Sequence, residues 1–220
     1  MAVRHFLFPL AIAASAVALV GPAQAERTVL APLPTLSIAP TADREVAIFA
    51  GGCFWGVEGV FEHVRGVTSA VSGYTGGQSA RPTYDAVSGG STGHAEAVRV
   101  TFDPKVVRYT DLLRIYFSVV ADPTMLNAQG PDRGTQYRTA LFPTTAAQER
   151  QARAYLTQLR SQRVFDRPIV TRIESLRGFT KAEIYHQDYM MKNPNAGYIV
   201  ANDRPKVEAL KRLFPKSYRG

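Results

Sequence analysis

The chain has 220 residues, of which 45% are hydrophobic and 20% charged, as expected for a soluble globular protein of one domain. Its 26 Lys and Arg exceed its 18 Asp and Glu, and the formal net charge is +8. The basic residues are scattered and form no long run, which argues against a nucleic-acid site and indicates a solvated surface with a mild preference for acidic partners.

Residues 1–25 have the pattern of a secretory signal peptide. A basic start at Arg4 precedes an apolar core from Phe6 to Val20, and Ala23-Gln24-Ala25 supplies the small-x-small pattern of a cleavage site. We expect cleavage before Glu26 and an exported protein, periplasmic or secreted, that leaves the membrane. The apolar core is short and contains a proline, which disfavours a stable membrane span; an uncleaved anchor is the alternative.

Residues 26–44 contain Pro32, Pro34 and Pro40 among small residues and show no periodicity, so this segment is predicted to be a Pro-rich linker. The catalytic domain is then expected to occupy residues 45–220.

The most informative stretch, Gly51-Gly52-Cys53-Phe54-Trp55-Gly56, holds the only cysteine and the only tryptophan. The apolar run at residues 45–50 predicts a buried strand, and apolar residues at helical spacing from Val57 predict a helix. Cys53 would then lie at a helix N-terminus, where the dipole lowers the pKa of a thiol and favours the nucleophilic thiolate. The alternative is a buried structural cysteine.

A second strand is predicted at residues 66–74. Residues 78–93, which include Tyr84, are predicted to form a long loop, of the kind that is either functional or disordered. In the next strand, residues 94–102, side chains alternate, so Glu96 shares a face with Val98 and Val100. Burial on that face would raise the pKa of Glu96 and keep it protonated, as a general acid requires. The alternative is a solvated glutamate at a frayed strand end.

The remainder of the chain mixes helices and strands without strict alternation, which favours an α+β sandwich over a doubly wound sheet. A binding loop is predicted at residues 122–137. The other predicted elements are a helix capped by Thr110, a strand at 137–142, a helix with a Thr145–Gln148 capping box, a strand at 169–176, a helix at 182–191 and a last helix from Pro205.

Five segments together resemble the peptide methionine sulfoxide reductase A family in order and spacing. This resemblance implies a two-layer α+β sandwich around a ferredoxin-like core, with no metal and no organic cofactor. It implies reduction of the S epimer of methionine sulfoxide, free or in oxidised peptides and proteins. The segments are Gly52-Cys53-Phe54-Trp55-Gly56, Gly73-Tyr74-Thr75-Gly76-Gly77, residues 93–98, residues 122–124 and residues 129–137.

The resemblance also implies roles for individual residues. Cys53 would attack the sulfoxide sulfur and become a sulfenic acid, while Glu96 donates the proton that the departing oxygen needs. Tyr84 and Tyr137 would donate hydrogen bonds to that oxygen. The implied substrate-binding residues are Phe54 and Trp55 around the methyl group, Asp132 and Tyr189.

The chain departs from the family pattern in one respect. Many members recycle through a second cysteine after an Asn-Pro…Gly-Tyr turn, but here the turn at residues 193–198 is followed by Ile199. With one cysteine, the sulfenic acid has no internal thiol to condense with. We therefore expect a monomer that is regenerated by an outside thiol, either a thioredoxin-like protein or a small thiol.

Two other classes of protein fit some of these residues. A cysteine hydrolase would pair Cys53 with His94 or His186 as its base. A non-catalytic peptide-binding module would use the same aromatic residues without turnover.

Overall fold

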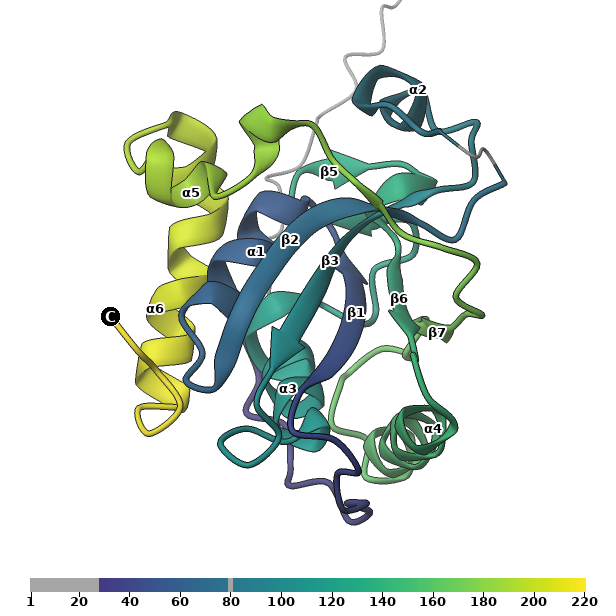
Figure 1. The fold of residues 1–220 in the computed structure, drawn as a ribbon, viewed down its shortest axis with the longest axis vertical. Coiled ribbons are helices and arrows are strands. Elements are labelled where there is room, and N and C mark those ends of the chain that lie inside the picture. Colours follow the sequence, from purple (N-terminus) through teal and green to yellow (C-terminus); the bar gives the residue numbers. More distant parts are fainter. Residues whose placement is uncertain (1–27, 79–80) are drawn as a thin grey trace, which may run out of the picture.

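The computed structural model describes residues 28–78 and 81–220. A mixed six-stranded sheet forms its centre, in the order β7-β6-β1-β3-β2-β8 (Figure 1). All neighbouring strands are antiparallel except β6 and β7, which are parallel. The predicted α+β class is confirmed. The strands are β1 (Glu45–Gly51), β2 (Val67–Thr75), β3 (Ala95–Phe102), β6 (Thr139–Phe142), β7 (Arg172–Ile173) and β8 (Thr180–Lys181), with β4 (Ala128–Gln129) and β5 (Asp132–Arg133) in a small second sheet.

Helices flank this sheet. They are α1 (Phe54–Glu62), α2 (Tyr84–Ser88), α3 (Tyr109–Ile115), α4 (Ala146–Ser161), α5 (Tyr189–Lys192) and α6 (Arg204–Leu213). Two π-helical turns, Tyr116–Val120 and Ile199–Asp203, extend α3 and precede α6, and 3-10 turns occur at Thr135–Tyr137 and Ile184–His186. Within residues 28–78 and 81–220, we find no helix with the length and apolar character to cross a bilayer.

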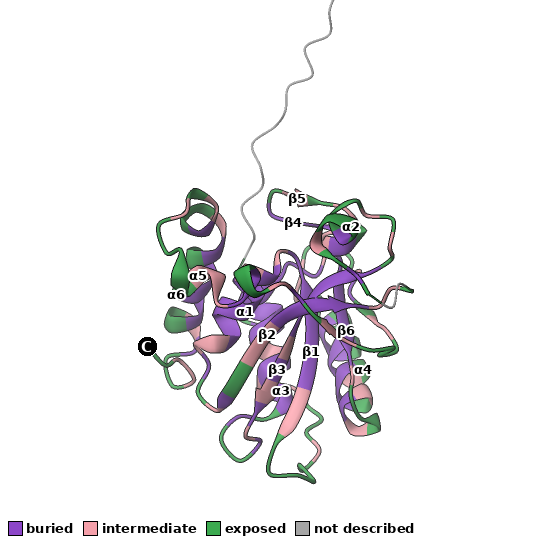
Figure 2. Ribbon diagram, turned by 45° about the horizontal axis from the view of Figure 1, so that its top comes forward, coloured by how far each residue is buried: buried purple, intermediate pink, exposed green. Residues whose placement is uncertain are grey.

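The two faces of the sheet carry side chains of different size. On one face, Phe49 stacks on Phe61 of α1 at 4.8 Å and on Tyr116 at 5.5 Å, and these rings belong to the main core. The opposite face carries a small cluster that is mostly alanine, with Ile48 and Phe142. Figure 2 shows that most of β1 and β3 is buried. Strand alternation therefore directs the large residues, and Glu96 with them, towards the helices.

The segment predicted to be a linker is docked on the domain from residue 28 onwards. Ala31 is fully buried, and its N–H donates to Ser118 Oγ at 3.0 Å. Tyr155 donates to the Pro32 carbonyl at 2.6 Å, and Gln158 accepts from the Thr35 N–H at 2.9 Å. Side chains of α4 and of the turn that extends α3 thus bond to backbone groups of this segment. These bonds hold the segment in place although its sequence has no helical or strand periodicity. The predicted signal peptide lies outside the described residues.

Other elements differ from their predictions for local reasons. The loop at 78–93 contains α2, because Thr83 accepts a hydrogen bond from the Ala86 N–H and caps it. The helix predicted to follow a Thr110 cap begins two residues earlier, at Tyr109, because Arg108 is its N-cap and Asp111 Oδ2 accepts from the Arg108 N–H. The strand at 169–176 is reduced to Arg172–Ile173, since the Val170 N–H donates to Pro123 outside the sheet. The helix at 182–191 is broken where Asp188 adopts a φ of +54°.

Candidate active site

The predicted site residues converge at one end of the sheet. Gly51 pairs with Thr139, and Thr75 pairs with Ala95. The segments that leave β1 and β2 therefore meet those that enter β3 and β6. This end carries Cys53 after β1, Tyr84 after β2, Glu96 near the start of β3 and Tyr137 before β6.

Cys53 is the N-cap residue of α1 and is half-buried. Gly52 has a φ of +91°, and a Cβ at this position would lie 2.6 Å from the Gln129 side chain, so this turn requires glycine. The Cys53 side chain makes no capping hydrogen bond with the first turn of α1. The predicted place of Cys53 at the beginning of a helix is confirmed.

The protonation state of Cys53 differs from the prediction. Burial raises the pKa of the Cys53 thiol well above its usual value, and the nearby carboxylates of Glu96 and Asp203 raise it further. The Trp55 N–H acts in the opposite direction. The prediction of a lowered pKa is therefore wrong, because desolvation and neighbouring acids outweigh the helix N-terminus.

Glu96 lies on the core face of β3, with only 2% of its surface exposed. Its Oε2 accepts a hydrogen bond from the Phe54 backbone N–H at 3.0 Å. Burial raises the pKa of Glu96 to about 8, and the charges of Asp132 and Asp203 act in the same direction, against the Phe54 N–H. The carboxyl group therefore keeps its proton to a higher pH than an ordinary glutamate, in the direction that a general acid requires.

Tyr84 and Tyr137 lie half-buried beside these two groups. Burial raises the pKa of each phenol, and the charges of Glu96 and Cys53 raise both further. Both hydroxyls therefore remain hydrogen-bond donors. Tyr84 is positioned by Glu183, whose Oε1 accepts from the Tyr84 N–H at 2.9 Å and whose Oε2 accepts from the Tyr74 hydroxyl at 2.8 Å.

Asp132 is held by Tyr198, which the sequence pattern did not single out as a site residue. The Tyr198 hydroxyl donates a hydrogen bond to Asp132 Oδ2. Burial raises the pKa of Asp132, and the bond from Tyr198 and the charge of Lys206 limit that rise. The only signal for Tyr198 in the sequence was its place in the turn at residues 193–198.

Asp203 is a second acidic residue that the sequence did not indicate. It is 1% exposed and raises the pKa values of both Cys53 and Glu96. A Cβ at Gly56 would collide with the Asp203 carboxylate, so the glycine in the first turn of α1 permits this close approach. Asp203 ends a π-helical turn far along the chain, where no local pattern marks it.

An aromatic wall adjoins the cysteine. The half-buried Trp55 stacks on Tyr189 with a centroid distance of 3.8 Å and an interplanar angle of 9°. Its indole N–H donates to His186 Nδ1 at 3.1 Å, and Tyr198 meets its ring edge-on at 5.8 Å. Trp55 and Tyr189 thus lie together, as the predicted substrate pocket requires.

Phe54 is buried more deeply than Trp55. It is 1% exposed, with its ring 5.8 Å from that of Tyr74 and 4.9 Å from that of His186. The first residue of α1 points its ring into the core, so Phe54 lies behind His186 and supports the wall from within. Its backbone, which binds Glu96, is its direct link to the site.

The histidines are not arranged as a hydrolase requires. His186 Nδ1 accepts from Trp55, so its lone pair is occupied, and burial lowers the pKa of His186. His94 precedes β3, and its ring packs against Gly77. Among the described residues, the charged groups that shift the Cys53 pKa are carboxylates, namely Glu96, Asp203 and Asp132. This geometry disfavours a Cys-His pair.

Three further carboxyl groups meet between α1 and α5. Glu58, Glu62 and Asp188 each offer an oxygen within 4.8 Å of the others, a grouping that could hold a cation. Both oxygens of Glu58 already accept backbone hydrogen bonds, from Ser72 at 3.0 Å and Asp188 at 2.9 Å. The cluster therefore has a structural role in joining α1 to its neighbours, and we assign no metal to it.

Comparison with known proteins agrees with this site. Residues 45–218 match the profile of the family described as peptide methionine sulfoxide reductase. The chain is 55% identical over 174 residues to peptide methionine sulfoxide reductase MsrA 2 of Mesorhizobium japonicum, covering 79% of this chain and 89% of the relative. It is 53% identical over 180 residues to the MsrA protein of Deinococcus radiodurans, covering 82% and 87%.

Solved structures give the same result for the fold. Mxr1 from Saccharomyces cerevisiae in its reduced form superposes with a TM-score of 0.64 at 32% identity, covering 72% of this chain and 91% of that chain. Methionine sulfoxide reductase A of Corynebacterium diphtheriae superposes with a TM-score of 0.60 at 28% identity, covering 81% and 91%.

Proposed function

The chain belongs to the peptide methionine sulfoxide reductase family, and from this premise we propose that its reaction is carried by Cys53 and Glu96. The chain is a peptide-methionine (S)-S-oxide reductase, which reduces the S epimer of methionine sulfoxide to methionine. The observation that supports the mechanism is a buried carboxyl group, that of Glu96 on β3, hydrogen-bonded to the first turn of the helix that follows the only cysteine.

The proposed chemistry is an oxygen transfer between two sulfur atoms. The Cys53 sulfur attacks the sulfoxide sulfur as the thiolate, and Glu96 protonates the sulfoxide oxygen so that the S–O bond can break. The thiol proton replaces the one that Glu96 gave up. The S–O bond breaks as the new S–S bond forms, and the released hydroxide then attacks the Cys53 sulfur, breaks the S–S bond and frees methionine. The substrate sulfur has then gained two electrons, the Cys53 sulfur has lost two, and the oxygen is bound to Cys53 as a sulfenic acid.

The surrounding residues would bind and orient the sulfoxide. Tyr84 and Tyr137 stay protonated, so both can donate hydrogen bonds to its oxygen. Trp55, fixed by Tyr189 and His186, would hold the methyl group, with Phe54 behind it. Asp132, joined to Tyr198, would organise the opposite side.

A separated-epimer assay tests this function. Purified protein with dithiothreitol is given a peptide that contains either the S or the R sulfoxide. We expect methionine only from the S epimer, and none from either epimer with Cys53→Ser. Cleavage of an ester or peptide that is lost in His186→Ala or His94→Ala would instead support a hydrolase. Binding of the peptide without turnover, retained in Cys53→Ser, would indicate a binding module.

Regeneration is proposed to use an outside thiol. The single cysteine leaves the sulfenic acid without an internal partner, so a thioredoxin-like protein or a small thiol would attack it directly. The first attack expels water and forms a mixed disulfide with Cys53. A second thiol then releases the reduced enzyme, and no second copy of the chain is required.

The fold and location are proposed in the same way. The order β6-β1-β3-β2, with α1 between β1 and β2 and α3 between β3 and β6, supports a ferredoxin-like core in a two-layer sandwich. The pattern at residues 1–25 supports a cleaved signal and an exported protein, periplasmic or secreted. The family match at residues 45–218 supports a catalytic domain at 45–220, on which the Pro-rich segment docks. N-terminal sequencing of protein from its native host should read from Glu26; an intact Met1 would contradict the cleavage.

A further inference from the structure

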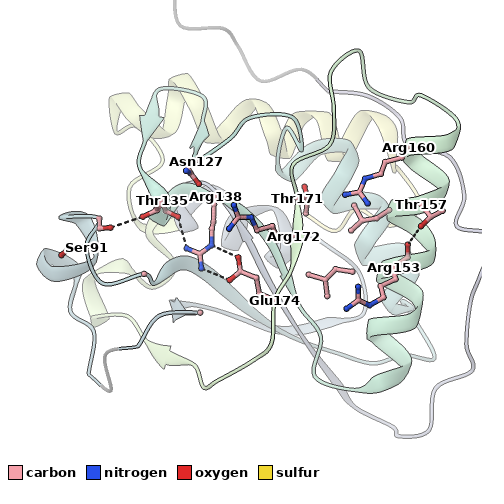
Figure 3. A pocket seen from close by; sticks show the side chains of 15 residues that line it. Ser91, Asn127, Thr135, Arg138, Arg153, Thr157, Arg160, Thr171, Arg172 and Glu174 are labelled. Atoms are coloured by element: carbon pink, nitrogen blue, oxygen red, sulfur yellow. Dashed lines mark hydrogen bonds and ion pairs between the residues drawn. The ribbon is translucent and has the colours of Figure 1, made fainter.

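A hollow lies between α4 and the edge strand β7. Its volume is about 990 Å³, and we call it the α4–β7 groove. Figure 3 shows Arg153, Thr157 and Arg160 projecting from α4 on one side, with Arg172 and Glu174 on the other. Four of its lining residues are arginines (the fourth is Arg138), and Glu174 is the one acidic residue among them.

The described acidic residues in and near this groove pair with only two of its four arginines. Arg138 donates to both oxygens of Glu174 at 2.9 Å, which neutralises that acid. Arg153 pairs with Glu149 on the same helix at 2.7 Å. Arg160 and Arg172 are exposed, and neither forms an ion pair with any residue that the structure describes. Arg160 and Arg172 thus line the groove without a described acidic partner, which favours an anionic occupant.

The groove begins close to the catalytic end of the sheet. Gly51, which ends β1, pairs with Thr139, and Thr171 of the groove donates to Thr139 Oγ1 at 3.0 Å. Because neighbouring strands lie about 4.8 Å apart, Thr171 is roughly 10 Å from the end of β1. Arg138 also follows Tyr137 directly in the chain, and its Nη1 donates to the Thr135 carbonyl at 3.0 Å.

An extended peptide advances about 3.3 Å per residue, so roughly three residues cover this distance. The lining also offers Leu156 and Ile173 for the apolar parts of side chains. We propose that the α4–β7 groove binds acidic residues of the oxidised polypeptide, at positions about three to six residues from the methionine sulfoxide. This inference rests on the proposed function and gives the enzyme a preference among protein substrates.

Matched peptides test the proposal. Each contains one S sulfoxide and, three to six positions away on one side or the other, Asp residues, Asn residues or Lys residues. The test variant is Arg160→Glu with Arg172→Glu. The control is Arg212→Glu with Lys216→Glu, which makes the same charge change at exposed positions in and after α6, on the other side of the molecule from α4 (Figure 1). N-acetyl methionine sulfoxide serves as a substrate too small to reach the groove.

For the parent, we expect the KM of the best-placed Asp peptide to lie roughly three- to tenfold below that of its Asn counterpart, as two exposed ion pairs would give. Arg160→Glu with Arg172→Glu should remove this difference and leave kcat and the turnover of N-acetyl methionine sulfoxide unchanged, whereas the control should retain the difference. Fluorescence anisotropy of labelled peptides measures binding without turnover, and it should give the same order of affinities for the peptides.

Equal KM values for Asp and Asn peptides in the parent would overturn the proposal. A preference for Asp that persists in the groove variant would also overturn it, by placing the site elsewhere. A variant that changes only the KM for a thioredoxin-like reductant would show that the groove serves that partner instead. Failure of the parent to reduce N-acetyl methionine sulfoxide would contradict the proposed function, and the anisotropy series would still decide the groove.

Discussion

The backbone N–H of Phe54, the residue that follows Cys53, donates a hydrogen bond to Oε2 of Glu96 at 3.0 Å. This bond attaches the acid on β3 to the first turn of α1, whose N-cap is the nucleophile. The two reacting groups are thereby held by one short connection between a strand and a helix. The same N–H lowers the pKa of Glu96, but burial outweighs it and leaves the pKa at about 8.

Glu96→Gln should retain the fold and slow the chemical step. The amide oxygen of glutamine can still accept from Phe54, but the side chain can no longer supply a proton. We expect a reduction of about 10²–10⁴-fold in the single-turnover rate, the usual contribution of general acid catalysis. Stopped-flow measurement from pH 5 to 9 should show the deficit shrinking at low pH, and a variant as fast as the parent at pH 7 would remove Glu96 from the mechanism.

Stability should fall as the pH rises through neutrality. The pKa values of Glu58, Glu62 and Glu96 are raised from 4.5 to about 7, 8 and 8 by burial. Between pH 4.5 and 8 the folded chain binds protons that the unfolded chain releases, so these groups stabilise the fold below pH 4.5 and lose that effect by pH 8. Urea unfolding gives the free energy of unfolding at each pH. In Glu96→Gln, the decrease of this free energy with pH should be smaller by up to about 1.4 kcal/mol per pH unit. An unchanged slope would show that Glu96 is ionised in the fold.

Tyr84→Phe and Tyr137→Phe should each lower kcat with little change in KM. Each removes one hydroxyl donor from the site, and loss of an oxyanion donor costs about 10²–10³-fold. Tyr185→Phe is a matched control for Tyr84→Phe, because Tyr185 is exposed and its ring lies 4.2 Å from that of His186, whereas the Tyr84 ring lies 4.5 Å from it. Full activity in both site variants would show that neither phenol contacts the sulfoxide oxygen.

Trp55→Ala should weaken substrate binding, because it removes the ring that stacks on Tyr189 at 3.8 Å. Trp55→Phe should keep part of the stacking and lose the bond to His186, with a smaller rise in KM. The fluorescence of this sole tryptophan should also change when substrate binds or Cys53 is oxidised. Constant emission at saturating substrate would place Trp55 away from the pocket.

The features of the site that depend on local sequence could be predicted from the sequence. The helix after Cys53 follows from apolar spacing, and the burial of Glu96 follows from strand alternation, so both predictions are confirmed. The prediction of a long strand at residues 169–176 was wrong. The Val170 N–H donates to the Pro123 carbonyl, so the beginning of this segment lies outside the sheet.

The features that the sequence did not indicate depend on contacts between distant segments. Tyr198 reaches Asp132 across 66 positions, and Asp203 reaches α1 only because Gly56 lacks a side chain. The shift in the pKa of Cys53 was predicted in the wrong direction, again because it depends on residues that are distant in the sequence. A helix N-terminus can be recognised locally, whereas the carboxylates that oppose it come from β3 and the turn before α6.

The most direct measurement is the mass of the intact protein after one equivalent of S sulfoxide peptide, without reductant. A monomer heavier by one oxygen should form, react with a sulfenic-acid trap, and return to its original mass when a thiol is added. The R epimer and the Cys53→Ser variant should give no increase. An unchanged mass while methionine is produced would contradict oxygen transfer to Cys53, and an obligatory disulfide-linked dimer that is competent on reduction would contradict regeneration of the monomer by an outside thiol.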